Sequence, residues 1–393
     1  MNVVGGIGWS TSFTYLSLYL YQQRHMPMTL VGLLMLISGI SSGVCQVLSG
    51  LAGDRFGHRR MTLLFAGAGV IVSAALAVLV GLQAPTWSIV FSAILVPTLG
   101  SAVGPPLNAI IIRASPQNRL TESYSLQAIA GNISWSIGPL LGGFLLGFAP
   151  FAWLFGIGAA FKALALAGIP FLPADTETEH SQRKPARSLK MLIPNHAVII
   201  FSLMAVFFYL TMTQWGSTLS VFTVDRVGFS TAQYGLLMSI SGILTIIFQY
   251  PIAHGFSERT KKALVFGCLF YAVGFLSLAW VKAFIPAIGS IVIMVIGEML
   301  FVPSAMAAVG KLAVEEDKGK SMGFYGLCST MGFSLGPLLG GFLLDRYPTS
   351  PLFLWGPISL CSCVAAMGFA LWKGYSEHNE SRPPDPPLTL RVT

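Results

Sequence analysis

Charged side chains are scarce in this sequence: Lys, Arg, Asp and Glu together make up 10% of its 393 residues, against roughly 25% in soluble domains. That scarcity excludes an ordinary soluble enzyme. Hydrophobic residues supply 54% of the chain, and the mean hydropathy is +0.72. A chain with so little charge and so much apolar side chain is expected to lie within a membrane.

Cysteines are few as well, and the usual signatures of catalysis are missing. The G-K-S sequence at 319–321 resembles the end of a phosphate-binding loop, but Val314 stands where that motif requires a glycine, and no HExxH sequence occurs. We therefore expect no enzyme activity, no cofactor and no metal, and an ion gradient as the energy source. The five cysteines all lie in apolar stretches, without metal-ligand or disulfide spacing: Cys45, Cys268, Cys328, Cys361 and Cys363.

Long apolar runs, in contrast, are abundant. They are continuous and helix-long, unlike the alternating segments of about ten residues that form membrane barrels. A helix needs roughly 20 apolar residues to cross a bilayer, so we predict an all-α membrane protein with twelve transmembrane helices. The runs are Val3–Tyr21, Leu30–Ala52, Met61–Gly81, Trp87–Ile112, Ser123–Phe148, Pro150–Leu172, Ala197–Ser220, Ala232–His254, Ala263–Val281, Phe284–Leu312, Ser321–Leu344 and Pro351–Trp372.

Basic residues are distributed unevenly among the connections. The loops after the even-numbered runs, with the C-terminal tail, hold 18 Lys and Arg residues, and the loops after the odd-numbered runs hold four. Cytoplasmic loops carry the excess of Lys and Arg, so both termini are expected in the cytoplasm, most simply of a plasma (inner) membrane. The net charge of +8 thus reflects topology. It does not indicate a nucleic-acid partner.

Two apolar stretches occur twice. "VGLLMLISGISSGVCQ" at 31–46 returns as "YGLLMSISGILTIIFQ" at 234–249 with nine of sixteen positions identical, and "SIGPLLGGFLL" at 136–146 returns as "SLGPLLGGFLL" at 334–344. Two six-helix units in the same orientation are predicted. Paired repeats build many secondary transporters, which hold substrate near the midplane between the halves. The alternative is an old duplication kept only for packing.

One polar connection separates the two units and sets the expected domains. These are an N-terminal half (1–172), a cytoplasmic linker (173–194), a C-terminal half (195–373) and a tail (374–393). The tail contains "RPPDPP" and is too polar and proline-rich to pack, so we expect it to be disordered. We expect a monomer in contact with membrane lipid.

The loop "SGLAGDRFGHRR" at 49–60 carries a specific resemblance. It is similar to the cytoplasmic signature G-x-x-x-D-R-x-G-R-R/K-x of the major facilitator superfamily, with His58 in place of a usual basic residue. The resemblance implies a latch between the halves when the transporter faces outward, with the run beginning near Lys320 as partner. The alternative is a basic turn that only sets topology. The matching residues are Gly50, Asp54, Arg55, Gly57, Arg59 and Arg60.

The two "GPLLGG" elements resemble the antiporter signature of that family, although Ser134 replaces one glycine of the first copy. Small residues four apart let helices approach closely, and proline bends a helix. We interpret these elements as a pliable seam that rocks during transport, with plain close packing as the alternative. The residues are Gly138, Pro139, Gly142 and Gly143 in the first copy, and Gly332, Gly336, Pro337, Gly340 and Gly341 in the second.

Glu298 is the one carboxylate placed near the middle of an apolar run. A charge there costs at least about 2.5 kcal/mol, so it should face a wet cavity or a partner. Burial favours the protonated carboxyl group, and "GE" before proline resembles drug:proton antiporters of the superfamily, so Glu298 is the proton-coupling candidate. The alternative is a structural hydrogen bond. Lys162 is interpreted as a structural or snorkelling amine, and Asp345 as a rim residue.

Polar and aromatic residues gather on the runs that line the cavity in this family. Amides and phenols with little fixed charge suit an amphipathic or neutral small molecule, although each one alone is more often a bond between helices. The cavity candidates are Tyr15, Tyr19, Gln46, Asn108, Gln127, Asn132, Trp135, Tyr209, Gln214, Trp215, Gln249 and Tyr325.

The resemblance implies a secondary transporter that exports small amphipathic compounds in exchange for protons by alternating access. Two departures from the drug-exporter branch stand against a standard proton relay: no basic residue lies between Trp87 and Arg113, and the first run lacks the usual proline pair. A facilitator or symporter of a sugar or other metabolite is the alternative within transport. A non-transporting membrane scaffold or sensor is the alternative outside it.

Overall fold

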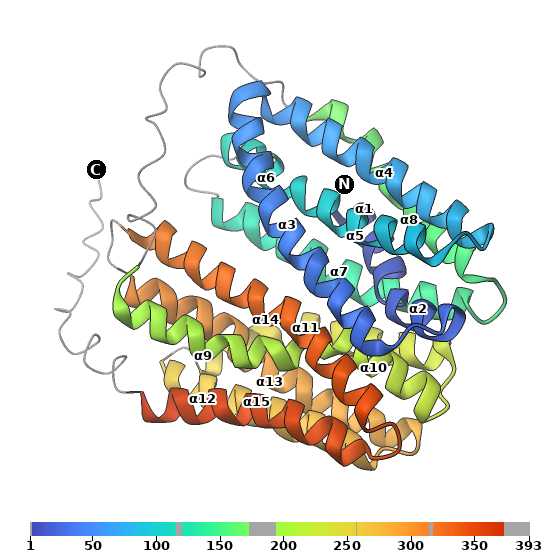
Figure 1. Cartoon of the computed structure of the whole chain (residues 1–393). Helices are drawn as coiled ribbons and strands as arrows, with labels where there is room; N and C mark the ends of the chain where they lie inside the picture. Colours follow the sequence, from blue (N-terminus) through green and yellow to red (C-terminus); the bar gives the residue numbers. More distant parts are fainter. Residues whose placement is uncertain (1, 115–119, 173–193, 257, 314–316, 373–393) are drawn as a thin grey trace, which may run out of the picture.

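The structure is a computed structural model that describes residues 2–114, 120–172, 194–256, 258–313 and 317–372. These ranges are helical almost throughout and contain no strand, as the sequence predicts (Figure 1). The predicted linker, apart from its last residue, and the predicted tail lie outside the described residues. The longer helices are α1 (Asn2–Phe13), α2 (Leu16–Arg24), α3 (Met28–Phe56), α4 (His58–Gly81), α5 (Thr86–Ala102), α6 (Gly104–Ala114), α7 (Leu120–Leu145), α8 (Phe151–Ala167), α9 (His196–Met212), α11 (Thr231–Gly255), α12 (Thr260–Ser277), α13 (Phe284–Leu312), α14 (Lys318–Arg346) and α15 (Pro351–Leu371).

Ten helical stretches within the described ranges are long and apolar enough to cross a membrane. The two predicted runs outside this group, Val3–Tyr21 and Ser123–Phe148, are also helical. The first is divided, because α1 ends at Phe13 and α2 begins at Leu16. The second corresponds to α7, whose sequence includes Gln127 and Asn132. The chain is thus a multi-pass membrane protein.

Two further runs that the sequence predicts as continuous are interrupted. Val103 separates α5 from α6, directly before Gly104 and two prolines that cannot donate backbone hydrogen bonds. The stretch His196–Arg226 changes from α9 to a 3-10 turn at Thr213–Gly216, then to the short helix α10 (Thr218–Val221) and a π-helical turn. Such interruptions release backbone groups from the helical ladder, and they often mark functional positions.

Helices close in sequence pack together, and three pairs join distant parts of the chain. Helices α1 to α8 contact one another, as do helices α9 to α15. Between these sets, α3 packs against α14, α7 against α11, and α2 against α10. Figure 1 shows α3 and α14 meeting near the start of α3 and diverging toward its other end. The main cavity lies between these crossing helices.

Candidate functional site

A cavity of about 660 Å³ lies between the crossing helices. Its size falls within the range of pockets that hold drug-sized molecules, roughly 300–1,000 Å³. Residues from α1, α3, α5, α7, α11, α13 and α14 and the 3-10 turn at Thr213–Gly216 form the wall. Five aromatic side chains belong to this wall, namely Trp9, Phe13, Trp135, Trp215 and Phe333.

Glu298 of α13 lies on the cavity wall, and it is the one charged side chain among the described residues that line it. Its Oε2 atom accepts a hydrogen bond of 3.2 Å from the Tyr271 hydroxyl of α12. That hydroxyl in turn accepts a 2.8 Å hydrogen bond from Nε1 of Trp215, which also lines the cavity. Glu298 has no salt-bridge partner in the described ranges. A carboxylate so placed can attract a cation into the cavity.

The first sequence repeat and the second repeat meet crosswise, starting with α3 and α14. Gly32 lies directly against the backbone of Pro337 and Leu338, and Gly39 lies against Ser334. A methyl group at either glycine would overlap these atoms. The two helices therefore touch over two turns, with glycine on α3 facing the "SLGPLLGG" element of α14.

The same contacts recur between α11 and α7. Gly235 lies against the Pro139 carbonyl, and Gly242 lies against Ser136. The Ser239 hydroxyl also donates a 2.5 Å hydrogen bond to the Ser136 carbonyl. Each copy of the first repeat thus packs on the copy of the second repeat that lies in the other half of the sequence. The molecule therefore has two matching seams, one between α3 and α14 and one between α7 and α11.

The glycines of the "GPLLGG" elements divide between two neighbours. Gly138 and Gly142 lie against α1, whereas Gly143 lies against Thr231 at the start of α11. In α14, three glycines lie against the segment from α9 to α10, and the last lies against the Met28 backbone of α3: Gly332, Gly336, Gly340 and Gly341. The motif therefore packs one helix into its own group of helices and against a helix of the other group.

Polar contacts close one end of the cavity beyond the seams. Asp345 of α14 accepts hydrogen bonds from the Met28 amide at 3.0 Å and the Thr29 amide at 2.7 Å, at the start of α3. On the other seam, Tyr15 donates a 2.6 Å hydrogen bond to the Pro139 carbonyl, and Thr231 donates a 3.0 Å bond to the Gly143 carbonyl. Both seams are thus tied at the same end.

The opposite end of the cavity is wider. Gly43 of α3 and Gly131 of α7 line the wall there, and a methyl group built on either one would have open space around it. The same holds for Gly326 of α14. The helices of each seam therefore separate toward the end of α3, and the cavity opens on the side that carries the 49–60 loop.

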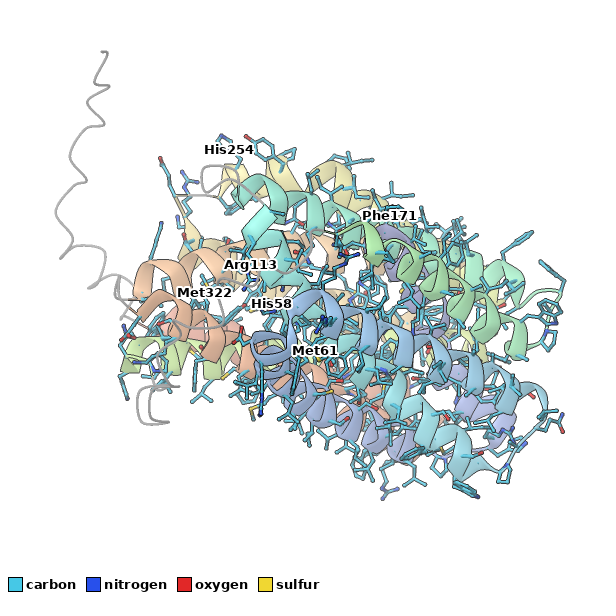
Figure 2. All side chains as sticks on the ribbon, turned by 90° about the horizontal axis from the view of Figure 1, so that it is seen from above. His58, Met61, Arg113, Phe171, His254 and Met322 are labelled. Carbon is cyan, nitrogen blue, oxygen red and sulfur yellow. The ribbon has the colours of Figure 1, made fainter. Side chains whose placement is uncertain are left out.

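The segment 49–60, which the sequence predicts as a loop, is helical except at Gly57, because α3 continues to Phe56 and α4 begins at His58. Gly57 has φ 96°, a backbone conformation that favours glycine. Asp54 lies 3.5 Å from Nε2 of His58, and Arg59 donates a 2.5 Å hydrogen bond to the Pro170 carbonyl. Arg55 lies in the last turn of α3 and Arg60 in the first turn of α4, and Gly50 faces Pro105. Figure 2 shows His58, Arg113 and Met322 toward one end of the molecule.

Four of the predicted cavity residues lie on the wall: Gln46, Asn132, Trp135 and Trp215. The others lie outside the lining, and most of them bond between or within helices.

The bonds of these residues join side chains or reach a backbone carbonyl. Tyr209 and Tyr325 share a 2.7 Å hydrogen bond, and Gln127 donates to Asn108 at 3.3 Å. Gln214 donates to the Gly336 carbonyl at 2.8 Å, and the Tyr19 hydroxyl accepts from Arg24 at 2.8 Å. Tyr15 donates to the Pro139 carbonyl at the seam, and Gln249 lies toward the end of α11.

Several residues of the site are not among those predicted from the sequence. Trp9 and Phe13 lie four apart on one face of α1, and their rings stack at 4.7 Å on the cavity wall. Two aromatic residues four positions apart are visible in the sequence and could have indicated a shared aromatic face on this helix. Tyr271 offered none, because a tyrosine on a peripheral apolar helix has no distinguishing context. Lys162 donates a 2.8 Å hydrogen bond to the Ser73 hydroxyl, away from the main cavity.

Comparison with known proteins agrees with this architecture. The chain is 24% identical over 345 residues to the uncharacterized MFS-type transporter YttB of Bacillus subtilis (strain 168), covering 86% of this chain and 85% of the relative. It is 23% identical to the multidrug resistance protein MdtH of Shigella dysenteriae serotype 1, covering 93% and 91%.

Solved structures share the fold at lower identity. A POT family transporter in complex with 5-aminolevulinic acid has a TM-score of 0.73 at 16% identity, covering 94% of this chain and 93% of that one. A mutant of the nucleoside transporter NupG has a TM-score of 0.74 at 18% identity, covering 94% and 97%. The model of the Major Facilitator Superfamily matches residues 1–300 and 216–391. Together with the apolar helices and the crossed repeats, this match means that the chain belongs to the Major Facilitator Superfamily of transporters.

Proposed function

We propose that this transporter exports small amphipathic compounds, with lipophilic cations as the first class to test, in exchange for protons. One observation carries the proposal: Glu298 is the single charge among the described residues of an otherwise uncharged wall that includes five aromatic side chains. An ionised carboxylate attracts a cation, and aromatic faces add attraction of about 0.5–2 kcal/mol. A proton on Glu298 cancels the first attraction, so proton and substrate compete for the cavity. The multidrug resistance name of the MdtH relatives supports export.

The membrane arrangement is part of the proposal. Twelve spans form two six-helix halves, 1–172 and 195–373, joined by a linker and followed by a tail. The basic loops lie in the cytoplasm, so the open end of the cavity faces inward. The crossed seams between the repeats support this layout, because each seam joins one half to the other.

Alternating access then follows from opening the seams. In the inward-facing state the cavity takes up substrate from the cytoplasm or the inner leaflet. Parting of α3 from α14 and α7 from α11 exposes Glu298 to the outside, where it releases substrate and takes a proton. The turn at 49–60 then latches the cytoplasmic end, with Asp54 as its acidic group. Proton and substrate must differ in affinity between the two states for the cycle to couple them.

Transport in proteoliposomes tests the proposal. We expect an imposed pH gradient to drive movement of tetraphenylphosphonium, and Glu298→Gln to abolish that gradient-driven component. Glu298→Asp keeps an ionisable group at the same site and should keep part of the activity. Gradient-driven movement at the unmodified rate in Glu298→Gln would contradict the assignment of this residue. Absence of transport for a broad panel of cations and neutral amphiphiles would contradict the substrate class.

A further inference from the structure

A chain of hydrogen bonds leads from Glu298 away from the cavity and back to it. The Tyr271 hydroxyl donates to Glu298 at 3.2 Å and accepts from the Trp215 indole N–H at 2.8 Å. Tyr271 is completely buried on α12, whereas Glu298 and Trp215 both lie on the cavity wall. A phenol has one proton to donate and two lone pairs. The Tyr271 hydroxyl therefore both donates and accepts a hydrogen bond only while Glu298 accepts its proton.

Trp215 is placed where the backbone leaves the regular helix. Its carbonyl accepts a 2.6 Å hydrogen bond from the Tyr234 hydroxyl of α11, and Ser217 nearby has φ −120° and ψ −81°, outside helical values. The Tyr234 ring meets the Tyr15 ring edge-on at 5.6 Å. Tyr15 in turn donates to the Pro139 carbonyl on α7. Contacts thus run without a gap from Glu298 to the seam between α7 and α11.

The charge on Glu298 decides how well this chain of contacts is satisfied. A hydrogen bond to an ionised acceptor is roughly twice as strong as one between neutral groups. After protonation, Tyr271 keeps only a weaker neutral bond, or it accepts from the acid and its own proton loses a partner in an apolar site. An unpaired buried donor costs about 1–3 kcal/mol. Either outcome favours a rearrangement of Tyr271 and Trp215.

We propose that Tyr271 and Trp215 are positioning residues that transmit the charge state of Glu298 to the seam between α7 and α11. This proposal rests on the proton-coupled function above and adds how protonation reaches the seam. With Glu298 ionised and no cation bound beside it, Trp215 is held in place and the seam stays closed. With Glu298 protonated, Trp215 is released, the break at 213–217 shifts, and the Tyr234–Tyr15 contact that supports the seam loosens.

The titratable groups that face Glu298 within the described ranges are tyrosines. Tyr271 faces it from α12, and Tyr209 faces it from α9 and is bonded to Tyr325 of α14. In the same ranges, α11 contributes no charged side chain to the cavity wall. Because tyrosine ordinarily titrates near pH 10, a pH effect on the seam near neutrality points to Glu298.

The test measures opening of the seam as a function of pH. Ser239 is buried at the seam, 2% exposed, so a lone cysteine placed there by Ser239→Cys in a chain without its native cysteines reports opening. Its labelling by a maleimide in proteoliposomes is measured at pH 6 and pH 8 and normalised to the unfolded chain at each pH. We expect about fivefold faster labelling at pH 6, within the range of measured couplings.

Three substitutions in this background separate the possibilities. Tyr271→Phe keeps the ring and should reduce the pH effect below about twofold, under the typical range of couplings, while tetraphenylphosphonium still binds. Trp215→Phe provides a second break in the same chain of hydrogen bonds if Tyr271→Phe folds poorly. Ser277→Ala is the matched control, because it removes a 2.7 Å bond to Ser290 between the same two helices without touching Glu298.

Each outcome bears on one claim. A full pH effect in both Tyr271→Phe and Trp215→Phe would overturn the transmission proposal and leave the proposed function intact. Loss of the effect in Ser277→Ala as well would also overturn it, because any weakening of the α12–α13 contact would then suffice. A pH effect that survives Glu298→Gln would instead remove Glu298 from coupling, and with it the proposed function.

Discussion

Single glycines decide how closely the seam helices approach, and two of them on α3 form a natural pair for comparison. Gly39 lies against Ser334, whereas Gly43, one turn further along the same helix, has no atom within 4 Å of an added methyl group. Both line the cavity. They differ in whether α14 lies close enough to contact a methyl group added to the glycine.

The two alanine substitutions should therefore have opposite effects. Gly39→Ala forces a methyl group into Ser334, and overpacking of this kind costs about 1–3 kcal/mol. Gly43→Ala meets nothing and gains helix propensity of about 1 kcal/mol. We expect the melting temperature of the purified protein to fall in the first variant and to stay or rise in the second.

A second substitution checks the cause. Ser334→Gly in the Gly39→Ala background removes the overlapping side chain and should recover most of the lost melting temperature. Equal effects of alanine at both glycines, or no recovery in the double variant, would mean that the seam is not packed at Gly39 as described.

At the scale of whole elements, α3 begins without a cap of its own. Pro27 precedes it and supplies no side-chain hydrogen bond, whereas α11 begins with a capping box formed by Ser230 and Gln233. The missing cap comes from α14, whose Asp345 accepts from the amides of Met28 and Thr29. The end of one helix thus satisfies the start of another across the seam.

Removing that cap should loosen the seam between α3 and α14. Loss of an N-cap side chain costs about 0.5–2 kcal/mol, so Asp345→Ala should raise the population in which the seam is open. A cysteine introduced by Ser334→Cys should then react faster with a membrane-impermeant thiol reagent applied to the side where α3 begins. Asp317→Ala is the control, because that carboxylate pairs with Lys320 of α14 at 3.2 Å, at the other end of that helix. Equal labelling in both variants would contradict a capping role in trans.

Individual elements show how far the sequence could be used. The run predicted at Phe284–Leu312 coincides with α13 at both ends, because long apolar periodicity reports a spanning helix directly. The repeats were evident, but a repeat indicates a packing face and not its partner, so the crosswise pairing was not predictable. Asp345 was interpreted as a rim residue since its bonding partners lie 317 and 316 positions away. Contacts of that kind leave no local pattern.

The placement of Glu298 was predicted on energetic grounds, and the residues that hold it were not. An unpaired acid in an apolar run is conspicuous because of its cost. Its partner Tyr271 is one of eleven tyrosines, and nothing in the surrounding sequence distinguishes it from the rest. Among the cavity candidates, phenols and amides satisfied between helices look the same in sequence as those that face a ligand. Only the fold separates Trp215 on the wall from Tyr209 behind it.

For the whole molecule, the two seams and the wide opposite end correspond to one extreme of the proposed cycle. Both seams lie at the end where α3 and α11 begin, and both use the same glycine and serine contacts. Because the seams are equivalent, opening one without the other would twist the set of helices that they join. We therefore expect both seams to part together, and a bond across either one to stop transport.

A reversible crosslink tests this expectation. Thr29 and Asp345 approach closely, with a 2.6 Å hydrogen bond between their side chains, so paired cysteines at these positions should form a disulfide under mild oxidation. The crosslinked protein should bind tetraphenylphosphonium from the open end but not carry it across, and dithiothreitol should restore transport. Cysteines at Gly43 and Gly326, where open space surrounds each position, serve as the control pair and should not crosslink in this conformation. Transport at an unchanged rate through the crosslinked seam would show that substrate crosses by a route that leaves α3 and α14 together, and alternating access at this seam would have to be abandoned.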